Sequence, residues 1–271
     1  MKIGFVVLCS TVCFMFCSFV SNPSYATPAF TNITDSDFAQ ITKEMSANFT
    51  HNSMMGASKL GTIFGFEVGL VGAQTGSPNT NAIAQRTAGS EIPSLYNAGV
   101  IAAVGVPFGL SAEVVMLPGL SASGSSFSSS SYALKMNMNE LIPVLPINLA
   151  VRGIYSNAKF SFSQTISGVA ASVDNKTAVT GVQLLLSPKL PVFEPYIGVG
   201  LLNGSNELSV TGTPGTVFDP SFSVGQSEKK TASSSQFLVG AEVSLLLIKF
   251  GAEYSQCFGA SRTGIKIAVG F

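Results

Sequence analysis

The strongest constraint on the fold is a strict alternation of polarity at the C-terminal end of the chain. In the segment Thr263–Phe271, the odd positions from Ile265 onward are apolar and the even positions are Gly, Lys and Ala. Because successive side chains of a β-strand point to opposite faces, this pattern predicts a strand with one apolar face. The segments 236–245 and 248–258 follow the same rule.

Seven segments upstream have the same character, so that we expect ten strands in all. They lie at about 62–74, 95–106, 110–119, 127–139, 147–160, 176–187 and 192–203. Short turns alternate with longer connections rich in Ser, Thr, Gly and Asn, which are 75–94, 120–126, 161–175 and 204–231. An even number of strands places both termini of the barrel at the end with the short turns, which we expect to face the periplasm. Merging or splitting weak segments would give eight or twelve strands instead.

The composition indicates what surrounds these strands. Of the 271 residues, 46% are hydrophobic and only 10% are charged, yet no apolar run of eighteen residues follows residue 27. Helices therefore cannot span a membrane there. In lipid every backbone polar group must be paired within the protein, so strands can span only as a closed barrel. We predict one all-β domain, an antiparallel transmembrane β-barrel over residues 62–271, with an exported soluble β-sandwich as the alternative.

The first residues are typical of an export signal. Lys2 precedes an apolar run that extends to Val20, and the small residues Ser24 and Ala26 fit a cleavage site. We predict a cleaved Sec signal peptide over residues 1–26, and a single membrane anchor is the alternative. Cleavage would leave Cys257 as the one cysteine of the mature chain, which excludes a disulfide within it.

An exported chain of alternating strands with this C-terminus resembles the outer-membrane β-barrels of Gram-negative bacteria. The matching residues are the last strand's Ile267, Val269 and terminal Phe271. In that family the terminal aromatic strand is the signal read by the barrel-assembly machinery, so the resemblance implies Sec and assembly machineries as partners. The fuller family signal has glycine five residues before the final aromatic residue, where this chain has Lys266.

Residues 27–61 precede the barrel and contain the pattern of an amphipathic helix. Four apolar residues form one stripe, which is Phe38, Ile41, Met45 and Phe49. The stripe could plug the lumen, lie on the membrane surface or contact a partner subunit. The helix is too weakly basic to bind anionic lipid, which argues against the membrane surface. We expect the stripe to cover an apolar cavity whose wall includes Ile101 and Leu185.

Charged residues within the strands predict the character of the interior. The alternation directs five acids and four bases into the lumen: Glu67, Glu113, Lys135, Arg152, Glu194, Glu242, Lys249, Glu253 and Lys266. A ten-stranded barrel is only slightly wider than the eight-stranded barrels that side chains fill. We therefore expect a network of ion pairs that closes much of the lumen. A selectivity constriction in an open pore and a catalytic carboxylate pair are the alternatives.

Two features predict contacts on the outside of the barrel. The segment 98–106 is apolar on both faces, and its small residues would let a neighbouring barrel pack closely: Gly99, Ala102, Ala103 and Gly105. Since the chain has no tryptophan, we expect phenylalanines and tyrosines to form the interfacial girdles, for example Tyr96, Tyr132, Tyr155, Tyr196 and Tyr254. These features predict a homo-oligomer that binds membrane lipid.

The sequence offers little for catalysis or for metal and nucleic-acid binding. The single histidine, His51, lies in the linker before the first strand, where we expect it to be solvated. A barrel hydrolase would have to recruit it across the structure. One histidine and one cysteine cannot supply a metal site. Fourteen acidic residues balance fourteen basic ones, which argues against nucleic acid. We expect no enzymatic activity and no cofactor.

A narrower similarity, carried by Gly61–Gly72 and Asn148–Phe162, is to the abundant porin-like barrels of predatory Gram-negative bacteria. It implies a passive porin-like or structural role in the cell envelope. A channel or carrier for a hydrophobic ligand, such as a lipid or a fatty acid, is the alternative function.

Overall fold

The computed structural model describes residues 33–89, 91–122, 125–142, 145–166, 169–211 and 227–271. The predicted signal peptide, residues 1–26, lies outside these ranges. Within the described ranges, no helix is long and apolar enough to cross a membrane.

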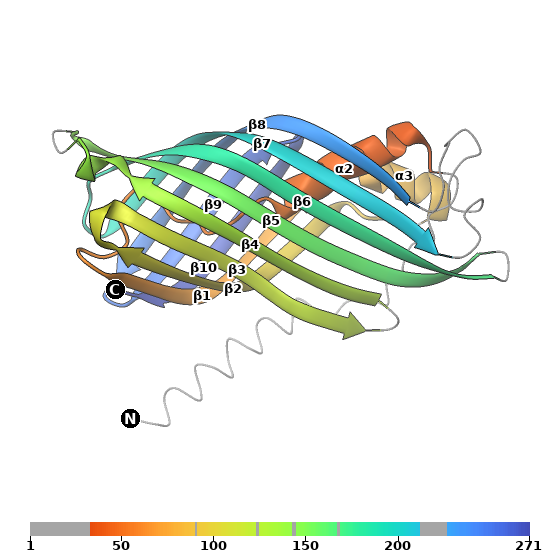
Figure 1. Cartoon of the computed structure of the whole chain (residues 1–271), viewed down its shortest axis with the longest axis horizontal. Helices are drawn as coiled ribbons and strands as arrows, with labels where there is room; N and C mark the ends of the chain where they lie inside the picture. The colour runs from red at the N-terminus through yellow and green to blue at the C-terminus, as the bar shows by residue number, and fades with distance from the viewer. Residues whose placement is uncertain (1–32, 90, 123–124, 143–144, 167–168, 212–226) are drawn as a thin grey trace, which may run out of the picture.

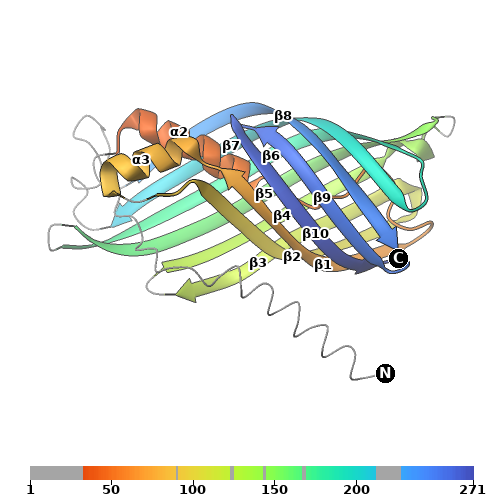
Figure 2. The ribbon, with the colours of Figure 1, turned by 180° about the vertical axis from the view of Figure 1, so that it is seen from behind.

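Ten antiparallel strands close into one barrel, as Figures 1 and 2 show. The strands are β1 (Gly65–Gly76), β2 (Ser94–Val106), β3 (Leu110–Ala122), β4 (Ser125–Asn137), β5 (Ile147–Ile166), β6 (Val169–Pro188), β7 (Phe193–Thr211), β8 (Ser227–Leu245), β9 (Ile248–Cys257) and β10 (Ala260–Gly270). Each strand pairs with its neighbours in the chain, and β1 pairs with β10, where Leu70 lies opposite Ile267. The predicted fold class and strand number are confirmed.

The two ends of the barrel differ (Figure 1). At one end lie short connections, which include the 3₁₀ turns η1 (Pro107–Gly109) and η2 (Met138–Glu140). The C-terminus also lies at this end. The backbone groups of Phe271 exchange two hydrogen bonds of 3.0 Å with those of Phe66, near the start of β1. At the other end lie the helices α2 (Asp35–Phe49) and α3 (Pro78–Ala88). We refer to them as the short-turn end and the helix end.

The strands β5 to β8 are longer than predicted at the helix end. They contain 19 or 20 residues, whereas β9 contains 10, so the expected loops 161–175 and 204–231 are partly strand. Their outward side chains there are polar, as at Lys159 and Lys176, while the inward Phe162 and Leu208 are buried and apolar. We expected loops in these segments because most of their residues are polar. Only the few residues of the inward face there are apolar.

The outer surface of the barrel carries an apolar belt. Each strand contributes outward-facing apolar side chains that are exposed, such as Phe66, Val104, Met116, Leu134, Val151, Leu184, Val199, Phe237, Phe250 and Ile267. Four of the five girdle tyrosines are also on this surface. Tyr196 is the exception, because its side chain is buried and its hydroxyl donates to Glu253 Oε2 at 3.0 Å. The girdle prediction is wrong for Tyr196, which shares the inward parity of Glu194.

The small residues of β2 do not form an outer contact surface. Gly99, Ala103 and Gly105 have the inward parity of the buried Ile101, and only Ala102 is on the outer face. A Cβ atom at Gly105 would lie 2.1 Å from the carbonyl oxygen of Leu60. The prediction that these residues receive a neighbouring barrel is therefore wrong for Gly99, Ala103 and Gly105, because they face the lumen, and it stays a prediction for Ala102.

Candidate functional site: a plug in the barrel lumen

Helix α2 lies inside the barrel at the helix end. It contacts strands on opposite sides of the wall, among them β6, β8, β1 and β2. A capping box begins the helix: Asp37 N donates to Thr34 Oγ1 at 3.1 Å, and Thr34 N donates to Asp37 Oδ2 at 2.9 Å. Of the apolar stripe, Phe38, Ile41 and Phe49 are buried and Met45 is partly buried. The helix therefore turns its stripe toward the wall.

The stripe does not cover the wall residues that we expected. Phe38 belongs to an apolar cluster with Phe162 and Leu208, in the extended part of the sheet. Ile101 instead belongs to a cluster with Met54 and Met55, and Leu185 to one with Ala57. The prediction for Ile101 and Leu185 is wrong because another part of the chain fills the lumen at their level.

That part is an irregular segment, residues 50–60, which we call the luminal linker. Nearly all of it is buried, including its polar residues Thr50, His51, Asn52 and Ser53. A buried segment without regular structure lacks the backbone hydrogen bonds of a helix or a sheet. Side chains must therefore supply hydrogen-bond partners for its N–H and C=O groups. Helix α2 and the luminal linker together form what we call the plug.

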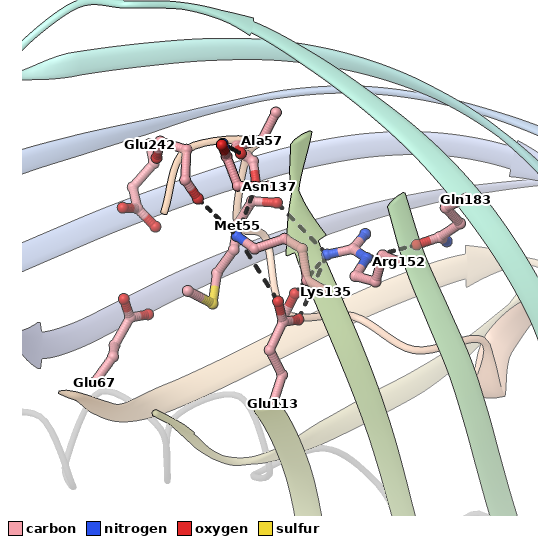
Figure 3. A network of polar contacts seen from close by, with 12 residues as sticks. Met55, Ala57, Glu67, Glu113, Lys135, Asn137, Arg152, Gln183 and Glu242 are labelled. Carbon is pink, nitrogen blue, oxygen red and sulfur yellow. Dashed lines mark hydrogen bonds and ion pairs between the residues drawn. The ribbon is translucent and has the colours of Figure 1, made fainter. Parts of the chain in front are cut away.

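Polar side chains of the wall supply these partners (Figure 3). Lys135 Nζ donates to the carbonyl oxygens of Gly56 and Ser58 at 2.9 and 3.1 Å, and Asn137 Nδ2 donates to that of Ala57 at 2.7 Å. Arg262 donates to the carbonyl oxygens of Thr50 at 2.5 Å and His51 at 3.2 Å. The wall therefore holds the linker near both of its ends through the backbone.

The structure places all nine predicted charges on the inward face, in separate clusters. Four of them form one cluster: Lys266 Nζ lies 2.7 Å from Glu67 Oε1 and 2.5 Å from Glu242 Oε2, and Lys249 Nζ lies 3.0 Å from Glu67 Oε2. In a second cluster, Glu113 Oε2 lies 3.6 Å from Arg152 NH1, and Glu113 Oε1 lies 3.9 Å from Lys135 Nζ. Figure 3 shows Glu67 apart from this second cluster.

The remaining two acids are held mainly by residues that the sequence reasoning missed. Glu194 accepts hydrogen bonds from Ser58 N at 2.8 Å and Ser187 Oγ at 2.6 Å. Glu253 Oε1 lies 3.7 Å from NH2 of the buried Arg262. Arg262 was missed because we expected the last strand to begin at residue 263. Its even number gives it the inward parity of Lys266, so the alternation rule identifies it once the strand is extended.

His51 is not solvated, contrary to expectation, because the linker that carries it runs inside the barrel. Its Nδ1 lies 2.9 Å from Ser131 Oγ and its Nε2 lies 3.1 Å from Glu113 Oε2. A hydroxyl, an imidazole and a carboxylate in this order resemble a catalytic triad. These residues are only 8%, 1% and 3% exposed, and the cavity beside Ser131 measures about 10 Å³. That volume suits one water molecule and no substrate, so we interpret the contacts as structural.

The helix end is closed by contacts between the two helices. Glu44 of α2 accepts from Asn79 N at 2.9 Å and Thr80 N at 2.8 Å, and so satisfies the first turn of α3. At the other end of α3, Arg86 lies 2.5 Å from Asp37 Oδ2. Burial alone would raise the pKa of Asp37, but the hydrogen bonds with Thr34 and the contact with Arg86 outweigh it and lower that pKa.

Groups suited to metal or redox chemistry are sparse in the lumen. In the described part of the chain, no three His, Cys, Asp or Glu side chains are grouped so that they could hold a metal ion. Cys257 is buried and free.

Several solved structures are similar to this chain at low sequence identity. The translocator domain of the autotransporter NalP from Neisseria meningitidis is 13% identical, with a TM-score of 0.46, and the match covers 87% of this chain and 96% of that one. The outer-membrane protease OmpT from Escherichia coli is 11% identical, with a TM-score of 0.40 and coverages of 81% and 100%. Ail, the attachment invasion locus protein of Yersinia pestis, is 11% identical, with a TM-score of 0.32 and coverages of 77% and 97%.

No curated protein matches the chain. The profile of a family of unknown function, DUF6588, matches residues 24–269, and the chain therefore belongs to that family.

Proposed function

We propose that this protein is a plugged outer-membrane β-barrel of a Gram-negative bacterium, with a passive, structural role in the envelope and no enzymatic activity. The observation that carries the proposal is the clamp on the luminal linker. Lys135, Asn137 and Arg262 direct their donors at linker carbonyl groups, which are 2.5 to 3.2 Å away. In an open pore such side chains would face water and permeating solutes instead.

The distribution of polarity supports the membrane location. On β7 the outward Phe193, Ile197, Val199 and Leu201 are exposed and apolar. Residues 193–201 extend about 20 Å along the barrel axis, at roughly 3.3 Å per residue and a strand tilt of about 40°. An apolar band of about this height around a closed barrel fits a bilayer, and in water it would be an aggregation surface.

The energetics of the clamp support a closed resting state. Withdrawal of the linker would leave Lys135 and Arg262 in the lumen without their carbonyl partners, and would expose the backbone groups of residues 50–58. Each hydrogen bond with a charged donor contributes about 1.5–3 kcal/mol, so several acting together hold the plug firmly. We therefore favour the structural role over porin-like permeation.

Conductance in planar bilayers tests this proposal. We expect the full-length wild-type protein to be silent and the double variant Lys135→Met/Arg262→Met to show stepwise openings. The matched control is Lys176→Met, because Lys176 lies on the outer face with an exposed side chain. Steady conductance by the wild type would refute the plugged state and favour the porin-like role.

Association with lipid and with other copies is part of the same proposal. The apolar belt is the surface that would contact lipid. We expect co-purifying lipid and a symmetric homo-oligomer in mild detergent. A lipid-free monomer by native mass spectrometry would contradict both expectations.

A further inference from the structure

The short-turn end carries exposed apolar side chains in every described connection around the barrel. Leu246, at the tip of the β8–β9 turn, is 98% exposed, and Phe108, in η1, is 79% exposed. Together with similar residues they form what we call the apolar rim: Ile63, Phe64, Phe108, Leu141, Ile142, Leu190, Val192, Leu246, Leu247 and Phe271. Turns that face water normally carry polar residues, so the rim requires an explanation.

Turn geometry does not provide that explanation. Phe108 has a φ of 68° and Leu246 a φ of 57°, within the left-handed region that favours Gly, Asn and Asp. A large apolar residue at such a position is unfavourable for the turn itself. These side chains must therefore be stabilised by something outside the turn, and within the described chain they are largely uncovered.

The rim is continuous with the apolar belt. Leu246 and Leu247 lie between Leu245 and Ile248, which are a cross-strand pair exposed on the outer face. Val192 likewise precedes the exposed Phe193. At these strands no polar side chains lie between the turn and the belt. At the helix end, by contrast, the belt is bordered by outward charged side chains, which are Lys159, Lys176 and Glu207.

Three charged side chains beside the rim already have partners. Lys59 Nζ lies 2.8 Å from Glu140 Oε1, and Lys189 Nζ donates to the carbonyl oxygen of Leu145 at 2.7 Å. The stem of a lysine can also carry its ammonium group from an apolar region to the headgroups. These three side chains therefore do not require that the turns stand in bulk water.

The dimensions of the belt agree with a deep position in the membrane. Along β6, Lys176 and Pro188 are twelve residues apart, or about 30 Å along the axis at roughly 3.3 Å per residue and a tilt of about 40°. An apolar band about 25 Å tall that stops short of the charged row at Lys176 reaches almost to the turn.

We propose that the apolar rim is immersed in the acyl chains of the leaflet at the short-turn end, so that the barrel stands out of the membrane mainly at its helix end. The occupant is lipid because the rim encircles the barrel, as a leaflet does, whereas a protein partner would select one side. The inference rests on the proposed membrane location.

Single-tryptophan fluorescence tests the proposal with the full chain, because the protein contains no tryptophan. The rim probes are Leu246→Trp and Phe108→Trp. The belt control is Leu184→Trp, and the water control is Lys176→Trp. Each variant is folded into phosphatidylcholine vesicles with or without bromine on the acyl chains, and acrylamide is then added to the aqueous phase.

We expect bromine to quench both rim probes at least half as strongly as the belt control, and acrylamide to quench them at least threefold less than the water control. Acrylamide quenching equal to that of Lys176→Trp would overturn the proposal and place the rim in water. Protection from both quenchers would also overturn it, since the rim would then be covered by protein. If bromine does not quench the Leu184→Trp control either, the result refutes the proposed membrane location itself and not only the proposed depth of the rim.

Discussion

The buried cluster around Lys266 allows a quantitative prediction for the variant Lys266→Met. Lys266 is almost completely buried, and its Nζ lies 2.7 Å from Glu67 and 2.5 Å from Glu242. Methionine retains the length of the side chain, so the substitution removes the charge with little change in packing. Two buried carboxylates would then share Lys249, which lies 3.0 Å from Glu67 and 3.8 Å from Glu242.

The expected loss of stability follows from this geometry. Removal of one partner from a buried ion pair typically costs about 3–5 kcal/mol, because the other charge is left uncompensated. Since Lys249 remains near both carboxylates, we expect a value near the lower limit, about 3 kcal/mol. The matched variant Lys176→Met removes an exposed lysine from Glu207, at 3.9 Å, and should cost at most about 1 kcal/mol.

Urea unfolding of the refolded protein in vesicles measures both free energies, with the gel mobility of the folded barrel as the signal. The double variant Lys266→Met/Glu67→Gln should recover part of the loss, because the carboxylate that lacked a partner is removed. The buried cluster does not stabilise the barrel in this way if Lys266→Met lowers the free energy of unfolding no more than Lys176→Met does. The same conclusion follows if adding Glu67→Gln to Lys266→Met lowers that free energy further instead of raising it.

Three further predictions concern the plug. Glu44→Gln should speed amide hydrogen exchange at the N-terminal turn of α3 about tenfold, which corresponds to a loss of about 1.4 kcal/mol in local stability. The reason is that a neutral amide replaces the capping carboxylate, and unchanged exchange would contradict this role of Glu44. Asp37 has a lowered pKa in the folded chain, so its stabilising effect is present above the usual value of about 3.9 and disappears as the pH falls through the lowered one. The stability difference between wild type and Asp37→Asn at pH 7 should accordingly vanish in strong acid, and a constant difference would refute this linkage. His51→Ala should destabilise the protein by about 1–3 kcal/mol and leave ester hydrolysis at background in both proteins, whereas a hydrolytic rate that is lost in the variant would establish an enzyme.

The sequence alone determined the features of the barrel wall. Strand number, the closed antiparallel arrangement and the inward direction of residues such as Glu67, Arg152 and Lys266 follow from an alternation with a period of two residues. That signal is local, because neighbouring side chains on one strand reach opposite environments whatever the rest of the fold does. Errors in the wall arose where the alternation was not applied consistently, as at Tyr196, or where a strand was drawn too short, as at Arg262.

Only the tertiary structure decided what fills the wall. The luminal linker has no periodic pattern, and its burial depends on Lys135, Asn137 and Arg262, which are at least 75 residues away in the chain. His51 shows the consequence: it looks like a solvated linker residue until the linker is placed between Ser131 and Glu113. A segment whose backbone is satisfied by distant side chains carries no local sign of burial, because the partners come together only when the barrel closes around it.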